Sequence, residues 1–194
     1  MLNTILKDYK IILASGSPRR QQFFKDLDLD FEIRLKEIEE VYPPNLREED
    51  ITDYLAVLKS DAFEGELKEG EILITSDTLV WHENKALGKP KDDQDAFAML
   101  KSLSNKTHKV ITSVCFKTKD KIEVISDTTH VTFNELSDAQ IQYYLEKYQP
   151  YDKAGSYGIQ EWIGFVGVSK IEGSYANVMG LPVDKVYDYL SKLA

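Results

Sequence analysis

Two arginines, Arg19 and Arg20, stand where a helix is expected to begin in the stretch ILASGSPRR (residues 12–20). The apolar residues at its start predict a buried strand. Ser17 is a good N-cap residue, and Pro18 suits the first helical position because it has no N–H to leave unpaired. Both cations would then lie in the first helical turn, where the dipole favours negative charge. They are either two solvated arginines or, with the N–H groups of the turn, part of an anion site.

Carboxylates occur at two further places where they could act on a bound anion. Asp77 directly follows the apolar strand expected over residues 71–76, and a strand end is a common position for a metal ligand or a general base. Glu39 and Glu40 follow the strand expected over residues 31–35. Each also has an ordinary interpretation, since aspartate is frequent in turns and paired glutamates are usual in a charged loop.

Two lysines could supply positive charge to the same anion. Lys59 lies at the border of the apolar face of the helix predicted over residues 51–64. A lysine there can also simply extend its stem over apolar surface. Lys89 precedes Pro90 and is therefore expected in extended backbone; its alternative is an ordinary surface lysine.

The stretch YDKAGSYGIQ (residues 151–160) combines two glycines with a glutamine. Gly155 and Gly158 flank Tyr157, so the backbone can approach a ligand closely there. Gln160 carries an amide that donates and accepts at once, and it could thus read the edge of a nucleobase. The alternative is a glycine-bearing hairpin with a surface glutamine.

The composition limits the classes of partner. The chain has 194 residues, 42% of them hydrophobic, and a formal net charge of −9; a protein that binds duplex nucleic acid usually carries a basic excess or stripe instead. No apolar run approaches the ~20 residues of a membrane span, and the first residues lack a signal-peptide pattern. Cys115, the one cysteine, stands in an apolar run typical of a buried thiol. We therefore expect a cytoplasmic protein that binds a small anion, with no nucleic acid and no membrane as partner.

Strands and helices alternate along the chain, with hairpins between some of them. The apolar patterns, caps and turns predict strands at 11–14, 31–35, 71–81, 109–117 and 121–133, and helices from Pro18, over 51–64 and 92–103, from the Ser137 capping box to 148, and over 183–193. Short strands are expected in the glycine-rich aromatic segment 154–175. This order indicates an α/β fold with a mixed twisted sheet and flanking helices.

Together, the order and spacing of these motifs resemble the Maf family of nucleoside triphosphate pyrophosphatases. The resemblance covers nearly the whole chain, so a single Maf-like domain over residues 1–194 is expected. The matching stretches are LASGSPRRQ (13–21), LAVLKSDA (55–62), SDTLVW with ALGKPKD (within 76–92), AFAMLKSLSNKTHKVITSV (96–114), YDKAGSYGIQ (151–160) and GSYANVMGLPV (173–183).

The resemblance implies a two-lobed fold around a central cleft, similar to inosine triphosphate pyrophosphatases. It implies hydrolysis of a nucleoside triphosphate to the monophosphate and pyrophosphate with a divalent cation, Mg²⁺ or Mn²⁺. Members with the Tyr-Gly-Ile-Gln pattern resemble the branch that acts on dTTP and UTP, for which nucleotide-pool sanitation is the expected purpose. The small-molecule triphosphate is the expected partner, and a homodimer is left open.

By motif position, the resemblance makes Asp77 the catalytic proton acceptor. The positions linked to base choice are matched by Arg19, Thr78 and Gln160. The phosphate-handling positions are matched by Ser15, Arg20, Lys59 and Lys89. The acidic positions near the metal are matched by Asp77 and by Glu39 or Glu40. Two arginines in a first helical turn then have an explanation, because a triphosphate would supply the missing negative charge.

The sequence departs from the usual family pattern at Asn105 and Glu161, and mildly at Ser76, which stands in place of an alanine. Asn105 stands where a glycine often precedes the Thr-His pair, and asparagine tolerates the left-handed backbone that such a turn needs. Glu161 stands where a glycine often follows the specificity glutamine, which adds a negative group there. Two other interpretations stay open: the same chemistry on another base, such as 7-methyl-GTP or inosine triphosphate, and a non-catalytic nucleotide-binding regulator of cell division. The retained Asp77, Lys59 and Lys89 favour catalysis.

Overall fold

The structure is a computed structural model that describes residues 2–193, and it separates into two compact units. The first unit contains the described residues up to Asp77, residues Thr112–Asp127 and those from Gly180 onward. The second unit contains Thr78–Ile111 and Thr128–Met179. Two units agree with the expected two lobes, whereas the central cleft stays a prediction.

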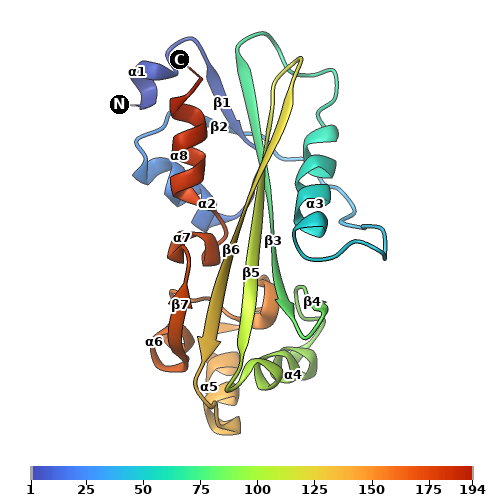
Figure 1. Cartoon of the computed structure of the whole chain (residues 1–194), viewed down its shortest axis with the longest axis vertical. Coiled ribbons are helices and arrows are strands. Elements are labelled where there is room, and N and C mark those ends of the chain that lie inside the picture. Colours follow the sequence, from blue (N-terminus) through green and yellow to red (C-terminus); the bar gives the residue numbers. More distant parts are fainter. Residues whose placement is uncertain (1, 194) are drawn as a thin grey trace. The chain divides into compact units, whose positions relative to one another are not determined.

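The elements divide between the two units (Figure 1). The first unit holds α1 (Leu2–Ile5), β1 (Lys10–Leu13), α2 (Pro18–Asp26), β2 (Phe31–Ile33), α3 (Glu49–Asp61) and α8 (Val183–Ser191). The second holds β4 (Lys85–Leu87), α4 (Asp93–Leu103), α5 (Asp138–Tyr148), the 3₁₀ turn η1 (Ala154–Ser156), α6 (Trp162–Gly167), β7 (Val168–Glu172) and α7 (Tyr175–Val178). The long strands β3 (Glu71–His82), β5 (Thr107–Lys117) and β6 (Ile122–Phe133) contribute residues to both.

Within residues 2–193, the strands form a seven-stranded mixed sheet in the order β2-β1-β3-β5-β6-β7, with β4 paired to β3. Strand β1 is parallel to both of its neighbours, β2 and β3. The pairs β3–β4 and β6–β7 are antiparallel. The expected α/β fold with a mixed sheet and flanking helices is therefore confirmed.

Successive residues of β1 point to opposite faces of the sheet in the first unit. Ile11 and Leu13 belong to a buried cluster that also contains side chains of α2 and α8. Ile12 belongs to a second cluster on the other face, with Leu73 and Phe63. Figure 1 shows α2 and α8 on one side of β1 and β3, and α3 on the other. Apolar side chains on both faces thus fix the ends of β1 and β3 between helices.

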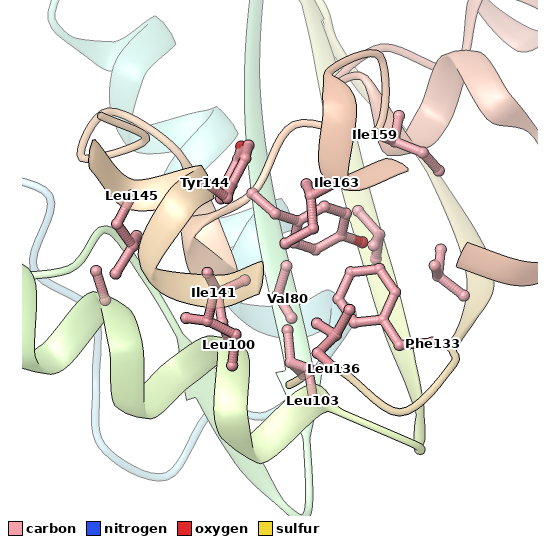
Figure 2. Close-up of a cluster of buried hydrophobic side chains, with 14 residues drawn as sticks. Val80, Leu100, Leu103, Phe133, Leu136, Ile141, Tyr144, Leu145, Ile159 and Ile163 are labelled. Carbon is pink, nitrogen blue, oxygen red and sulfur yellow. The ribbon is translucent and has the colours of Figure 1, made fainter. Parts of the chain in front are cut away.

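The second unit is built around one cluster of buried side chains, to which α4 and α5 contribute Leu100, Leu103, Ile141 and Leu145 (Figure 2). Both helices begin at side-chain caps. Asp92 accepts a hydrogen bond of 2.8 Å from the backbone N–H of Asp95, and α5 begins at the predicted capping box of Ser137.

Most predicted elements lie close to their expected bounds, but three details differ. Ser17 occupies the N-cap position of α2, yet its side chain makes no capping hydrogen bond. The helix expected over 51–64 ends at Asp61. In the segment 154–175, β7 is a strand as expected, but α6 and α7 are helical. Within α6, Gly164 lies close to the preceding chain: a Cβ there would lie 1.8 Å from the carbonyl oxygen of Ile159. This glycine lets α6 pack against the preceding backbone and does not mark a strand.

Candidate active site

The parallel strands of the first unit bring three chain segments to one edge of the sheet. Leu13, at the end of β1, is paired with Ile33 of β2 and with Ile74 of β3. Because the carboxyl ends of parallel strands share an edge, the segments that follow these residues emerge side by side. The segments after β1 and β2 carry Ser15 and the Glu39–Glu40 pair. Asp77 lies inside β3, three residues beyond Ile74, and β3 continues to His82, so the expected strand end at Asp77 was wrong. The fold therefore explains why residues far apart in sequence meet here.

Lys59 of α3 joins two of these carboxylates. Its Nζ lies 2.6 Å from Oδ1 of Asp77 and 3.1 Å from Oε1 of Glu40. The Asp77 side chain is 10% exposed and that of Lys59 is 17% exposed, whereas that of Glu40 is 42% exposed. The two buried charges thus neutralise each other, and Glu40 adds a second carboxylate from the solvent side.

The protonation state of Asp77 reflects opposing influences. Burial raises the pKa of its carboxyl, while the charge and hydrogen bond of Lys59 and the charge of Arg20 lower it; the net pKa lies above the usual value. Glu40 adds to the upward shift because it is a like charge. A buried carboxylate with a raised pKa and a cation in contact is suited to take up a proton from water.

Arg20 lies in the first turn of α2, as predicted, and its guanidinium is held by two backbone carbonyls. Nε donates to the carbonyl of Gly180 at 2.8 Å, and Nη1 donates to that of Ser76 at 2.9 Å. The carbonyl of Ser76 also accepts from Nζ of Lys59 at 3.4 Å. Burial lowers the pKa of Arg20 to about 10, against the opposing effect of Asp77. One carbonyl therefore holds two cations next to the buried carboxylate.

The loop between β1 and α2 is closed by its own hydrogen bonds. The hydroxyl of Ser15 accepts from the backbone N–H of Ser17 at 3.3 Å, and the Ser15 carbonyl accepts from Nε2 of Gln21 at 3.0 Å. Ser15 is buried and Arg19 is half-buried. Glu39 is exposed, and of the two glutamates it is Glu40 that forms an ion pair with Lys59.

The other predicted site residues, Thr78, Lys89 and Gln160, belong to the second unit. Lys89 is exposed and Gln160 is half-buried. Their two loops are joined, because the backbone N–H of Gly155 donates to the carbonyl of Gly88 at 3.1 Å. The structure thus brings together Arg20, Lys59, Asp77 and Glu40 in the first unit, while Ser15 contacts residues of its own loop. In the second unit it joins Gly88, next to Lys89, to Gly155 of the segment that leads to Gln160.

Comparison with known proteins identifies the family. The sequence model of the family described as Maf-like protein matches residues 10–193. This chain belongs to the Maf-like family. The expected family resemblance is therefore confirmed.

Close relatives of this Maf-like chain carry a common name. A protein of Flavobacterium johnsoniae named dTTP/UTP pyrophosphatase is 69% identical over 193 residues, which cover 100% of this chain and 100% of the relative. A protein of Christiangramia forsetii with the same name is 54% identical over 193 residues, covering 100% of this chain and 98% of the relative. Among solved structures, that of the Staphylococcus aureus Ham1 protein has a TM-score of 0.48 at 18% identity and covers 66% of this chain and 72% of its own.

The carboxylates of this Maf-like chain offer a sparse donor set for a metal. Among residues 2–193, no group of three or more His, Cys, Asp and Glu side chains is arranged to hold an ion. Asp77 and Glu40 nevertheless converge on one point, the ammonium group of Lys59. Magnesium is commonly bound through one or two carboxylates together with substrate phosphates. The two carboxylates therefore fit a divalent cation that arrives with a phosphate ligand.

Sequence reasoning did not find two features of the Maf-like site. The first is the pair of carbonyls that hold Arg20, at Gly180 and Ser76, because any residue presents a backbone carbonyl. The second is the environment of Glu161, which contacts Tyr144 and Lys153. The only hint of it was that glutamate stands where glycine is frequent.

In the described part of the chain, no helix is long and apolar enough to span a membrane.

Proposed function

We propose that this Maf-like chain hydrolyses dTTP and UTP to the nucleoside monophosphate and pyrophosphate. The observation that carries the proposal is the buried Asp77 carboxylate in contact with Lys59. The relatives named dTTP/UTP pyrophosphatase support the substrate, since one of them is 69% identical over the whole chain.

Asp77 would act as the general base. In this mechanism its carboxylate accepts a proton from a water molecule, and the water oxygen attacks the α-phosphorus. The bond between the α-phosphorus and the bridging oxygen to the β-phosphorus breaks, and that oxygen leaves with pyrophosphate. The raised pKa of Asp77 supports this role, because a base whose pKa is shifted toward neutrality accepts protons more effectively.

Positive side chains would neutralise the triphosphate. The chain as a whole carries a net charge of −9, which repels such a substrate, so cations must converge locally. Arg20 and Lys59 both contact the Ser76 carbonyl next to Asp77, and there they would stabilise the charge that spreads over the phosphoryl oxygens. Ser15 and Lys89 complete the proposed phosphate-binding set.

Asp77 and Glu40 would hold a divalent cation, Mg²⁺ or Mn²⁺, together with the substrate phosphates, and Glu39 remains the less favoured of the two glutamates. When bound, such a cation neutralises phosphate charge and lowers the pKa of a water molecule. Lys59 bridges both carboxylates, and it would turn toward the phosphates as they enter.

Base choice would depend on Arg19, Thr78 and Gln160. Thymine and uracil present a C4 carbonyl, an N3–H and a C2 carbonyl along one edge. The amide of Gln160 offers one acceptor and one donor, so it can pair with N3–H and a neighbouring carbonyl together.

The proposal extends to the setting of the reaction. The family model covers residues 10–193, which supports a single Maf-like domain over residues 1–194. The one cysteine, Cys115, is buried and free, as is usual in a reducing compartment. We therefore place the activity in the cytoplasm, as nucleotide-pool sanitation, with a nucleoside triphosphate as partner and a homodimer left open.

A panel of nucleoside triphosphates, scored for pyrophosphate release with Mg²⁺ or Mn²⁺, tests the proposal. The expected result is faster release from dTTP and UTP than from CTP, GTP, inosine triphosphate and 7-methyl-GTP. Faster release from a purine triphosphate would contradict the proposed substrate. No release from any nucleotide, by a protein that still binds UTP, would contradict catalysis and favour a binding role.

A further inference from the structure

Gln160 lies within a tight turn of the second unit. The backbone N–H of Glu161 donates to the carbonyl of Gly158 at 3.0 Å, so the turn runs over Gly158, Ile159, Gln160 and Glu161. Ile159 is buried and belongs to the cluster shown in Figure 2. Gln160 itself is half-buried. The turn thus presents one polar side chain from an anchored backbone.

A single hydroxyl connects the two ends of this turn. The Tyr144 hydroxyl of α5 accepts a hydrogen bond of 3.0 Å from the backbone N–H of Gly158, and it donates to Oε2 of Glu161. Burial and the neighbouring Glu161 raise the pKa of Tyr144, so the phenol stays protonated and remains a donor. Oε1 of Glu161 lies 3.2 Å from Nζ of Lys153. Both oxygens of the Glu161 carboxylate are therefore bound within this unit.

Two glycines fit closely against the same turn. A Cβ at Gly158 would lie 2.7 Å from Cδ of Glu161. A Cβ at Gly164 of α6 would lie 1.8 Å from the carbonyl oxygen of Ile159. Because the carboxylate is held by Tyr144 and Lys153, it cannot swing away at low cost to make room. The turn is thus enclosed by α5, by α6 and by its own glutamate.

The buried ion pair of Lys153 and Glu161 is not required merely to fill this part of the unit. The side chains of Lys153 and Glu161 are 11% and 18% exposed. Apolar residues of similar volume often stabilise such a place as well as an ion pair does, because taking two charges out of water is costly. What a satisfied polar network adds is one defined arrangement of its members. The arrangement defined here is that of the turn around Gln160.

We propose that Glu161, together with Tyr144 and Lys153, positions the amide of Gln160 for base recognition. This inference rests on the proposed function, in which Gln160 reads the base. It assigns Glu161 a role that glycine could not fill: the carboxylate points to Tyr144 and Lys153, and it fixes the residue before it. Glu161 is a positioning residue and does not contact the base.

The test uses Tyr144→Phe, which removes only the hydroxyl, and Tyr143→Phe as its matched control. Tyr143 is the exposed neighbour on the same helix, and its hydroxyl accepts a hydrogen bond from Lys147. Values of kcat and KM are measured for UTP and CTP. We expect Tyr144→Phe to lower the UTP-over-CTP ratio of kcat/KM by about tenfold, through UTP alone, and Tyr143→Phe to leave the ratio unchanged. A purely structural effect would lower kcat/KM equally for UTP and for CTP.

Two further variants keep the test decisive if Tyr144→Phe does not fold. Glu161→Ala should lower the ratio as Tyr144→Phe does, whereas Glu161→Gln should retain most of it, because an amide oxygen still accepts from Tyr144. Hydrogen exchange of the backbone N–H of residue 161 should become faster in Glu161→Ala than in wild type. This measurement does not depend on enzymatic activity. An unchanged UTP-over-CTP ratio and unchanged exchange in a folded Glu161→Ala protein would overturn the inference. Wild-type protein that does not hydrolyse UTP would instead overturn the proposed function, and the base-reading role would fall with it.

Discussion

The ammonium group of Lys59 lies 2.6 Å from the carboxylate of Asp77, and both side chains are largely buried. Burial raises the pKa of Asp77, and the charge of Lys59 opposes that rise. Lys59 therefore lowers the pH at which Asp77 gains its negative charge, against the larger effect of burial. The positive charge of Lys59 is not paired with Asp77 alone, because its ammonium group also forms an ion pair with Glu40.

Asp77→Asn should abolish pyrophosphate release while the chain stays folded. An amide has nearly the shape of the carboxylate, but it cannot accept the proton of the attacking water. Loss of a general base costs ~10²-fold or more in kcat. The measurement is pyrophosphate release from UTP, together with the thermal unfolding midpoint of the same preparation. Activity close to that of wild type would show that Asp77 is not the base.

Lys59→Met should move the acidic limb of the pH–rate profile to higher pH. Lys59 lowers the pKa of Asp77, so its removal leaves burial less opposed, and Asp77 stays protonated up to a higher pH. The profile of kcat/KM for UTP is compared with that of Lys36→Met, because Lys36 forms its ion pair with Glu66 and is not among the charges that shift the pKa of Asp77. A profile with reduced amplitude but an unshifted acidic limb would contradict this relationship.

The same substitution should change how stability depends on pH. The folded-state pKa of Asp77 lies above its ordinary value of 3.8, so the folded chain holds a proton that the unfolded chain releases. The stability from this group is therefore lost as pH rises from 3.8 toward the raised pKa. In Lys59→Met the loss should extend to higher pH, as measured by the thermal unfolding midpoint across the pH range.

Ser76→Ala should leave the free energy of unfolding unchanged or raise it by about 1 kcal/mol. Ser76 is 1% exposed, and its hydroxyl finds no hydrogen-bond partner among the described residues. Burial of an unpaired hydroxyl is unfavourable. The neighbouring Thr75 provides the matched control, because its hydroxyl donates to the carbonyl of Ala56 at 2.6 Å. Thr75→Val should therefore lower the free energy of unfolding by about 1 kcal/mol. Urea unfolding measures both, and a destabilised Ser76→Ala protein would mean that the hydroxyl is in fact satisfied.

The local parts of the fold and site were predictable because short-range chemistry decides them. The strand and turn before Pro18 and the capping box at Ser137 depend on residues within a few positions. The buried apolar run before Asp77 was also visible in the sequence, although Asp77 lies within β3 and not at the end of a strand. Residues that are neighbours in the sequence decide these features, through their apolar pattern and through the turns and caps that they form.

The contacts that complete the site were not predictable, because they join distant segments. Arg20 is held by carbonyls 56 and 160 residues away in sequence, and no residue type marks a carbonyl as a partner. The glycine-rich segment 154–175, which contains Gly164, misled the sequence interpretation for a related reason. Gly164 serves a close contact with Ile159, and such a contact exists only after the chain has folded.

Lys89→Ala should raise KM or lower kcat for triphosphates without lowering the thermal unfolding midpoint. Lys89 is exposed in the Gly88–Pro90 segment, so its removal costs no packing. Lys91→Ala is the control, because it deletes an exposed lysine from the same loop. A lower midpoint with unchanged kinetics in Lys89→Ala would assign this lysine a structural role.

Gln160→Glu should weaken the preference for UTP over CTP. The amide donor becomes an acceptor, so the carbonyl of uracil loses its partner, while the amino group of cytosine gains an acceptor. An unpaired buried polar group costs about 1–3 kcal/mol, which corresponds to roughly a ten- to hundred-fold change in kcat/KM. The UTP and CTP values are compared with those of Gln94→Glu, which adds the same charge at an exposed position of α4. A UTP/CTP ratio that equals the wild-type ratio in Gln160→Glu would rule out base reading by this amide.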